Sequence, residues 1–242
     1  MPIGDHLRDV QDLYGSPACH HTNAVLLAAG EKGVDLNCHA ESDWGPSSSI
    51  RGMSPLGIGP ILKDRECVNY GLVACLSYID DKGFGPSLVH RNGVTRARMY
   101  QEIGAAASCD PSDDASLSAC LDILEATLGS PLGNMRGDFV CGQYTLADCA
   151  WAGVCQVATN AGKGSAISSR SKVNTWWSAV QSHPSTSKEA INPYSCMASK
   201  PMLMLVRLEK FVLILSSTSY FSIIETPVFN WGFFFIGWCY HI

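Results

Sequence analysis

The feature that most restricts how this chain can fold is a short strand followed at once by a helix, over residues 10–34. Residues 10–14 are predicted to form the strand. Ser16 is the predicted N-cap of the helix because its hydroxyl can accept a hydrogen bond from a free first-turn N–H. Pro17 suits the first helical position, and Gly33 suits the end of the helix. This strand–helix unit indicates an α/β domain at the start of the chain.

Cys19 falls in the first turn of that helix. The N-terminal end of a helix carries partial positive charge, which favours a thiolate, the reactive form, over a thiol. The alternative is that Cys19 is one of many buried cysteines without a chemical role. His20 and His21 follow it, but neighbouring helical side chains point apart and rarely share a metal ion. We therefore expect no metal site.

Composition and charge argue against nucleic-acid binding and against secretion. The chain has 242 residues, 46% of them hydrophobic, and a net charge of −5 without a basic stripe, so we expect no binding to nucleic acid. Its 11 cysteines are irregularly spaced and include no Cys-x-x-Cys pair, unlike a secreted disulfide framework. The first residues lack an apolar signal segment. We therefore expect a cytoplasmic protein.

Further elements are predicted along the first third of the chain. Residues 34–39 alternate partly and indicate a second strand, and residues 40–53 indicate a loop with at most one short helix. Residues 66–69 are predicted to form a short strand and residues 71–81 a helix.

The pattern beyond residue 90 is helical. A linker over residues 82–90 precedes two predicted helices, at 91–107 and 115–128. Thr145 and Asp148 form a capping-box pattern at the start of an apolar helix. An α/β part followed by an all-helical part is the predicted architecture.

These motifs, in this order, resemble those of the glutathione transferases, most closely the plant-type phi class. In that family a serine or cysteine at the reactive position follows the first strand, and a Lys-Gly pair follows the first helix. The resemblance covers roughly residues 11–186. The residues that carry it are Cys19, Lys32-Gly33, the Ser54-Pro55-Leu56-Gly57-Ile58-Gly59-Pro60 segment, the Gly142 to Asp148 segment, and Trp176-Trp177 with His183-Pro184.

The resemblance implies a thioredoxin-like, glutathione-binding domain over residues 10–83 and a helical substrate domain over 90–190. It also implies a homodimer and an active site between the two domains, with glutathione as cosubstrate and no metal. Cys19 would be the reactive group. Pro60 would follow a cis bond, Gly59 and Pro60 would bind the glutathione backbone, and N–H groups near Leu72 would bind the γ-glutamyl carboxylate.

The chain departs from the family where the γ-glutamyl group binds. The family's Glu-Ser pair, at the start of the helix predicted over residues 71–81, is replaced by Gly71 and Leu72. The loop at 40–53 also lacks the His-Lys pair of phi-type members. Without two or three charge-assisted hydrogen bonds, at about 1.5–3 kcal/mol each, glutathione binding would be weaker by orders of magnitude.

Two functions remain open from the sequence. The first is an enzyme of the glutathione transferase type, linked to detoxification and stress response, that conjugates glutathione to small hydrophobic electrophiles or transfers thiols through Cys19. The second is a non-catalytic protein on the same fold, with a decayed glutathione site and an apolar cleft lined by Trp151. We expect disulfide-type turnover to exceed conjugation.

Residues 191–242 form an apolar extension of unknown role that the resemblance does not cover. Residues 211–224 are 14 residues without charge, a run shorter than the roughly 20 residues of a membrane-spanning helix. Three interpretations remain: a membrane-contacting tail, a helix packed on the preceding domain, or an extension without a defined role.

Overall fold

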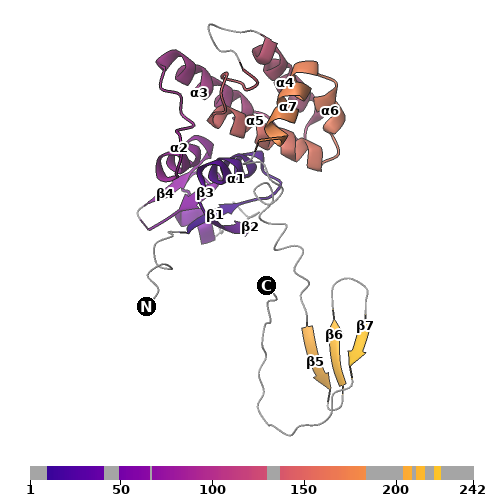
Figure 1. Ribbon diagram of the computed structural model, residues 1–242. Coiled ribbons are helices and arrows are strands. Elements are labelled where there is room, and N and C mark those ends of the chain that lie inside the picture. The colour runs from indigo at the N-terminus through magenta and orange to yellow at the C-terminus, as the bar shows by residue number, and fades with distance from the viewer. Residues whose placement is uncertain are drawn as a thin grey trace. The chain divides into compact units, whose positions relative to one another are not determined.

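The computed structural model describes residues 10–40, 49–65, 67–129 and 137–183, and the backbone of three strands between residues 204 and 224. The chain divides into two compact units, residues 1–193 and 194–242. In the first unit, a small sheet with two helices precedes a group of five helices (Figure 1). This arrangement confirms the predicted fold class, a thioredoxin-like part followed by an all-helical part.

Four strands build the sheet of the first unit, in the order β2-β1-β3-β4. The first two strands are parallel, whereas β3 runs antiparallel to both β1 and β4. Leu13 of β1 lies between Cys38 and Leu62 of its neighbours, and all three side chains are buried. The strands are β1 (Gln11–Gly15), β2 (Leu36–Ala40), β3 (Ile61–Lys63) and β4 (Val68–Tyr70), and a short 3-10 helix, η1, spans Ser49–Gly52.

Helix α1 (His20–Lys32) is the centre of the first unit. Every residue from Thr22 to Ala29 is buried, because α1 packs on the sheet and α2 (Leu72–Lys82) and also on α5 of the helical part. Gly33 ends α1 in the left-handed conformation, at a φ of 61°, as predicted. Eight consecutive residues of the helix are thus covered by other parts of the chain, whereas Gly30 near its end is exposed.

The helical part has five helices. They are α3 (Gly93–Ala107), α4 (Asp114–Gly129), α5 (Leu146–Asn160), α6 (Gly164–Ser168) and α7 (Ser171–Gln181). The bounds of α3 and α4 agree with the predicted 91–107 and 115–128 to within two residues. Helix α5 contacts α1, α3, α6 and α7, so its apolar side chains form the core of this part.

The predicted capping box at the start of α5 is present. The Asp148 carboxylate is fully buried and accepts hydrogen bonds from the Thr145 N–H (2.9 Å) and hydroxyl (3.0 Å). It also accepts from the Val140 N–H and the Trp176 indole N–H, both at 2.9 Å. Burial raises the pKa of Asp148, although these four donors favour the carboxylate. One side chain thereby joins α5, α7 and the segment before α5.

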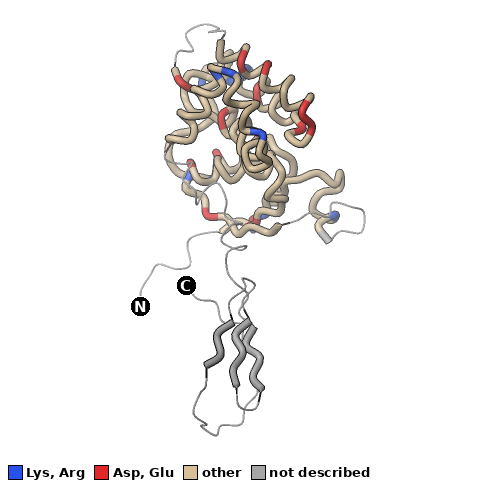
Figure 2. The backbone as a smooth tube through the Cα atoms, turned by 90° about the vertical axis from the view of Figure 1, so that its right-hand side faces the viewer, with Lys and Arg blue, Asp and Glu red and all other residues tan. Residues whose placement is uncertain are grey.

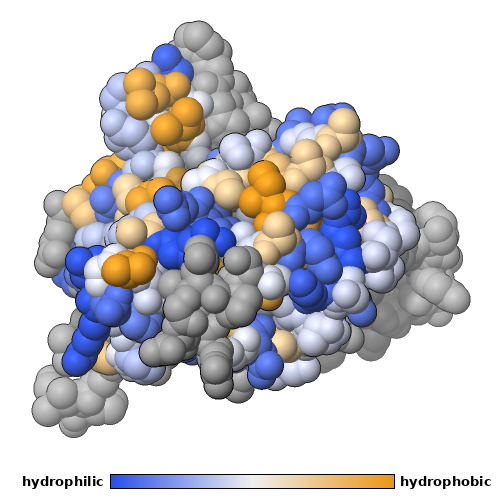
Figure 3. All heavy atoms as spheres, turned by 90° about the horizontal axis from the view of Figure 1, so that it is seen from above, coloured by the Kyte–Doolittle hydropathy of each residue, from blue (hydrophilic) through white to orange (hydrophobic). Residues whose placement is uncertain are grey.

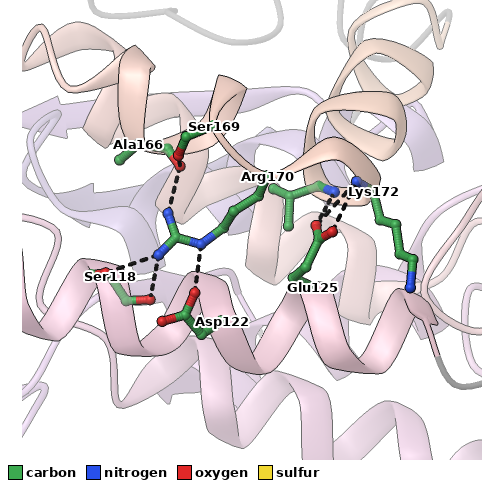
Figure 4. Close-up of polar contacts among 8 residues, drawn as sticks. Ser118, Asp122, Glu125, Ala166, Ser169, Arg170 and Lys172 are labelled. Atoms are coloured by element: carbon green, nitrogen blue, oxygen red, sulfur yellow. Dashed lines mark hydrogen bonds and ion pairs between the residues drawn. The ribbon is translucent and has the colours of Figure 1, made fainter.

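Polar contacts also hold α4 against the start of α7 (Figure 4). The Arg170 guanidinium donates to Asp122 (2.8 Å) and to the hydroxyl of Ser118 (2.8 Å). The Glu125 carboxylate accepts from the backbone N–H groups of Lys172 (3.1 Å) and Val173 (2.8 Å). Glu125 therefore satisfies N–H groups in the first turn of α7 that have no partner within the helix.

Surface charge and hydropathy are finely mixed over the described residues. Figure 2 shows Lys and Arg interspersed with Asp and Glu along the helices rather than gathered on one element. On the face seen in Figure 3, apolar side chains form separate spots among hydrophilic ones. Among the exposed apolar residues are Val94 and Ile123, which lie on different helices.

The described part of the second unit is a three-stranded antiparallel sheet. Its strands are β5 (Met204–Leu208), β6 (Phe211–Leu215) and β7 (Phe221–Ile224), in that order. The described residues of the extension are therefore strands, and the helical interpretation is wrong for them. Among the helices that the structure describes, none has the length and apolar character needed to cross a bilayer.

Candidate functional site

Three loops meet at one end of the sheet. Tyr14, at the end of β1, pairs with Ile61 at the start of β3, so the loop before α1 lies beside Gly59 and Pro60. Ile61 pairs in turn with Tyr70. The Gly71 N–H donates to the Pro60 carbonyl at 2.9 Å. The starts of α1, β3 and α2 are thus adjacent, and the peptide bond before Pro60 is cis, as predicted.

Cys19 is the N-cap of α1, not a residue of its first turn. The prediction that the helix begins at Ser16 and Pro17 is wrong. Residues 16–19 form a turn instead, closed by the Cys19 N–H donating to the Ser16 carbonyl at 3.0 Å. The Ser16 hydroxyl accepts from the Ala18 N–H at 3.2 Å, within this turn. Cys19 is partly exposed and lies at the N-terminal end of the helix dipole.

Asn23 fixes the conformation of this turn. Its side chain is 5% exposed, and its amide donates to the carbonyls of Pro17 (2.8 Å) and Cys19 (2.9 Å). Asn23 was not among the predicted site residues. Its signal in the sequence is a polar amide one turn after Cys19 and directly before an apolar run, because such a side chain needs hydrogen-bond partners when it is buried.

The two histidines after Cys19 connect α1 to the end of α3. His21 Nε2 lies 3.1 Å from the Ala107 carbonyl, and the two imidazole rings are 4.1 Å apart. Burial lowers the pKa of His20 to about 4, and it also lowers the pKa of His21. Both rings are therefore neutral at neutral pH and supply no positive charge to Cys19. No group of three or more candidate metal ligands occurs among the described residues.

The start of α2 offers backbone groups but no polar side chain. Gly71 is the N-cap, at a φ of 83°, a conformation that side-chain-bearing residues rarely adopt. The Leu72 side chain is only 6% exposed, so it belongs to the core. The first N–H groups of α2 lack partners within the helix, which makes its start suited to a carboxylate.

Trp151 does not line a cleft. It is fully buried in α5, and its indole N–H donates to the Glu102 carboxylate at 3.2 Å. Arg98 forms an ion pair with the same carboxylate at 3.0 Å. The expectation that Trp151 contacts an apolar ligand is therefore wrong, because its ring and its N–H are both used within the helical core.

The chain was compared with protein-family models, curated proteins and solved structures. No family model matches the chain. The stringent starvation protein A homolog of Coxiella burnetii is 28% identical over 91 residues, which are 38% of this chain and 44% of the relative. The chain thus matches less than half the length of that curated relative.

Solved structures match a larger share of the chain. Glutathione transferase F2 from Populus trichocarpa is 21% identical with a TM-score of 0.62, over 77% of this chain and 99% of that one. Maleylacetoacetate isomerase from Methylobacterium extorquens AM1 is 18% identical with a TM-score of 0.63, over 74% and 95%. FzlA from C. crescentus is 19% identical with a TM-score of 0.61, over 73% and 90%. The first unit of this chain therefore has the glutathione transferase fold.

Proposed function

We propose that this protein is a glutathione transferase-like enzyme, phi-like in its motifs, that transfers thiols through Cys19. The observation that carries the proposal is the meeting of the Cys19 turn, Gly59-Pro60 and the start of α2 at one end of the sheet. A thiol, the Gly59-Pro60 backbone and a helix N-terminus would match three parts of glutathione: its sulfur, its peptide groups and its γ-glutamyl carboxylate.

The proposed reaction is thiol–disulfide exchange. The Cys19 thiolate attacks a mixed disulfide of glutathione, a bond forms between Cys19 and the glutathione sulfur, and the other thiol leaves with a proton. A second glutathione thiolate then attacks this new bond, which releases glutathione disulfide and regenerates Cys19. Cys19 lies at the positive end of the helix dipole, and none of the first-turn residues of α1 is acidic.

Glutathione would be held mainly by backbone groups. Gly59 and Pro60 would bind its backbone, and the N–H groups around Leu72 its γ-glutamyl carboxylate. Each charge-assisted hydrogen bond that a Glu-Ser pair would add is worth about 1.5–3 kcal/mol, and about 1.4 kcal/mol is a tenfold change in affinity. We therefore expect a dissociation constant in the millimolar range.

The experiment begins with calorimetric titration of reduced glutathione into the full-length protein. Reduction of a small disulfide and conjugation of chlorodinitrobenzene are then measured for the wild type, Cys19→Ser and Cys67→Ser. Cys67 is the matched control because it is also a partly exposed free cysteine. Disulfide reduction should be lost with Cys19→Ser alone. Reduction that persists in Cys19→Ser contradicts the proposal.

The alternative is a non-catalytic protein that binds apolar ligands on the same fold. The observation that favours it is Gly71 and Leu72 where the family has its Glu-Ser pair. It predicts saturable binding of an apolar fluorescent dye together with undetectable glutathione binding. We further propose that the protein is a cytoplasmic homodimer active on small hydrophobic electrophiles in detoxification or stress, which sedimentation, cell fractionation and conjugation assays test.

A further inference from the structure

Three buried cysteines lie near one another in the helical part, close to the contact between His21 of α1 and Ala107 at the end of α3. Cys109 follows the end of α3, Cys120 lies in α4 and Cys155 in α5. Their exposed fractions are 3%, 8% and 0%. None of them has a role in the proposed glutathione chemistry, so their proximity has no explanation in that site.

Backbone geometry brings two of these sulfur atoms together. The Ser116 hydroxyl accepts a hydrogen bond from the Asp110 N–H at 2.9 Å, which fixes the start of α4 against the residue that follows Cys109. Ser116 and Cys120 are four residues apart and so share one face of α4. The Cys120 side chain therefore lies on the face of α4 that meets Cys109, and the two thiols are interacting neighbours.

This sulfur-to-sulfur contact differs from those of other buried cysteines in the chain. The Cys75 thiol donates to the Pro60 carbonyl at 3.5 Å, and the Cys149 thiol donates to the Tyr144 hydroxyl at 3.6 Å. Burial, together with the contact to Cys120, raises the pKa of Cys109 to about 12. Cys109 is thus a protonated thiol at neutral pH, and Cys120 is the more exposed residue of the pair.

We propose that Cys109 and Cys120 form a redox-active dithiol, which peroxides oxidise to an intramolecular disulfide. The Cys120 sulfur attacks one peroxide oxygen, the O–O bond breaks, and a sulfenic acid and one water form. The Cys109 sulfur then displaces the sulfenic hydroxyl, which leaves as a second water with the Cys109 proton. Two thiols and one hydrogen peroxide become one disulfide and two waters.

The sequence makes this pair easy to observe. Trypsin cleaves after Arg98 and Arg136, and the peptide between them contains Cys109 and Cys120 as its only cysteines. The folded full-length protein is treated with hydrogen peroxide, denatured, alkylated and digested. The expected peptide carries no alkyl group and is lighter than its reduced form by two hydrogen atoms. Treatment with dithiothreitol before alkylation should restore two alkylation sites.

Variants separate this pair from its neighbours. Cys109→Ala and Cys120→Ala should each abolish the unalkylated peptide, whereas Cys155→Ala should retain it. Cys19→Ser should also retain it, so failure of the glutathione proposal leaves this test intact. If circular dichroism shows that a variant does not fold, the alkylation state of the wild-type peptide still tests the proposal. Two alkylated cysteines after peroxide treatment, or a disulfide from Cys109 to Cys155, overturn the proposal.

Discussion

A buried ion pair between the ends of α1 and α2 yields the sharpest prediction about stability. Lys32 Nζ lies 3.2 Å from an Asp80 oxygen and donates to the Pro86 carbonyl at 3.0 Å. The Asp80 carboxylate also accepts from the Ser87 hydroxyl (2.6 Å) and the Leu88 N–H (2.7 Å). The Lys32 and Asp80 side chains are 3% and 2% exposed. The pair therefore fixes the segment after α2 to both helices.

Lys32→Met removes the ammonium group but keeps an apolar stem of similar length. The Asp80 carboxylate then remains buried without its cation, which costs about 3–5 kcal/mol of stability. This is a large share of the roughly 5–15 kcal/mol typical of a folded domain. Adding Asp80→Asn removes the unpaired charge and keeps hydrogen-bonding groups. The double variant should therefore be more stable than Lys32→Met alone.

The effect should depend on pH with a defined sign. Burial by itself would raise the pKa of Asp80, but the hydrogen bonds from Ser87 and Leu88 and the charge of Lys32 outweigh it, so the pKa is lowered. A carboxyl with a lowered pKa stabilises the fold above its unfolded pKa, and this contribution is lost as pH falls through the folded pKa. The difference between Lys32→Met and the wild type should thus be largest at neutral pH and shrink in acid.

Urea unfolding of the full-length protein, followed by tryptophan fluorescence, measures these differences. Lys63→Met is the matched control because Lys63 is exposed, and its effect should stay within about 0.5 kcal/mol. The reasoning is refuted if Lys32→Met costs no more than Lys63→Met, or if the double variant is less stable than Lys32→Met.

Three other predictions concern stability. Gly153→Ala should cost about 1–3 kcal/mol in urea unfolding, because the new Cβ would lie 2.3 Å from the His20 carbonyl oxygen where α5 meets α1; an unchanged midpoint would contradict this packing. Glu125→Ala should cost about 0.5–2 kcal/mol by removing the cap of α7, whereas Asp81→Ala, at an exposed position of α2, should stay within about 0.5 kcal/mol. Because burial lowers the pKa of His20 to about 4, the folded state becomes less stable as pH decreases from 6.5 towards 4. His20→Gln should flatten this dependence of stability on pH. The same slope in the wild type and the variant would contradict the role of His20.

Much of the fold was predictable because its signals are local. The Thr145 and Asp148 capping box and the Gly33 helix end each depend on residue types within a few positions, and the cis bond before Pro60 was implied by the family resemblance. The structure bears out all three. Helix periodicity likewise placed α3 and α4 to within two residues.

The rest depends on contacts between distant residues, which local patterns do not encode. Ser16 and Pro17 satisfy every local criterion for a helix start, yet the Asn23 amide holds Pro17 and Cys19 in a turn and moves the start of α1 to His20. Trp151 was expected to line an apolar cleft in the non-catalytic alternative. Its burial against Glu102 depends on the packing of α3 on α5.

The burial of residues 22–29 of α1 also limits which helical parts could be joined to this thioredoxin-like part in a chimera. The buried run Thr22–Ala29 packs against α2 and α5, and Gly153 allows the backbones of α1 and α5 to approach closely. An N-terminal fragment cut after α2 would expose the α5-facing surface of α1 to water, where it would promote aggregation. A chimera that exchanges the helical part succeeds only if its α5 also carries a small residue at this crossing. The thioredoxin-like part and the helical part therefore depend on each other to bury α1 and are not freely exchangeable.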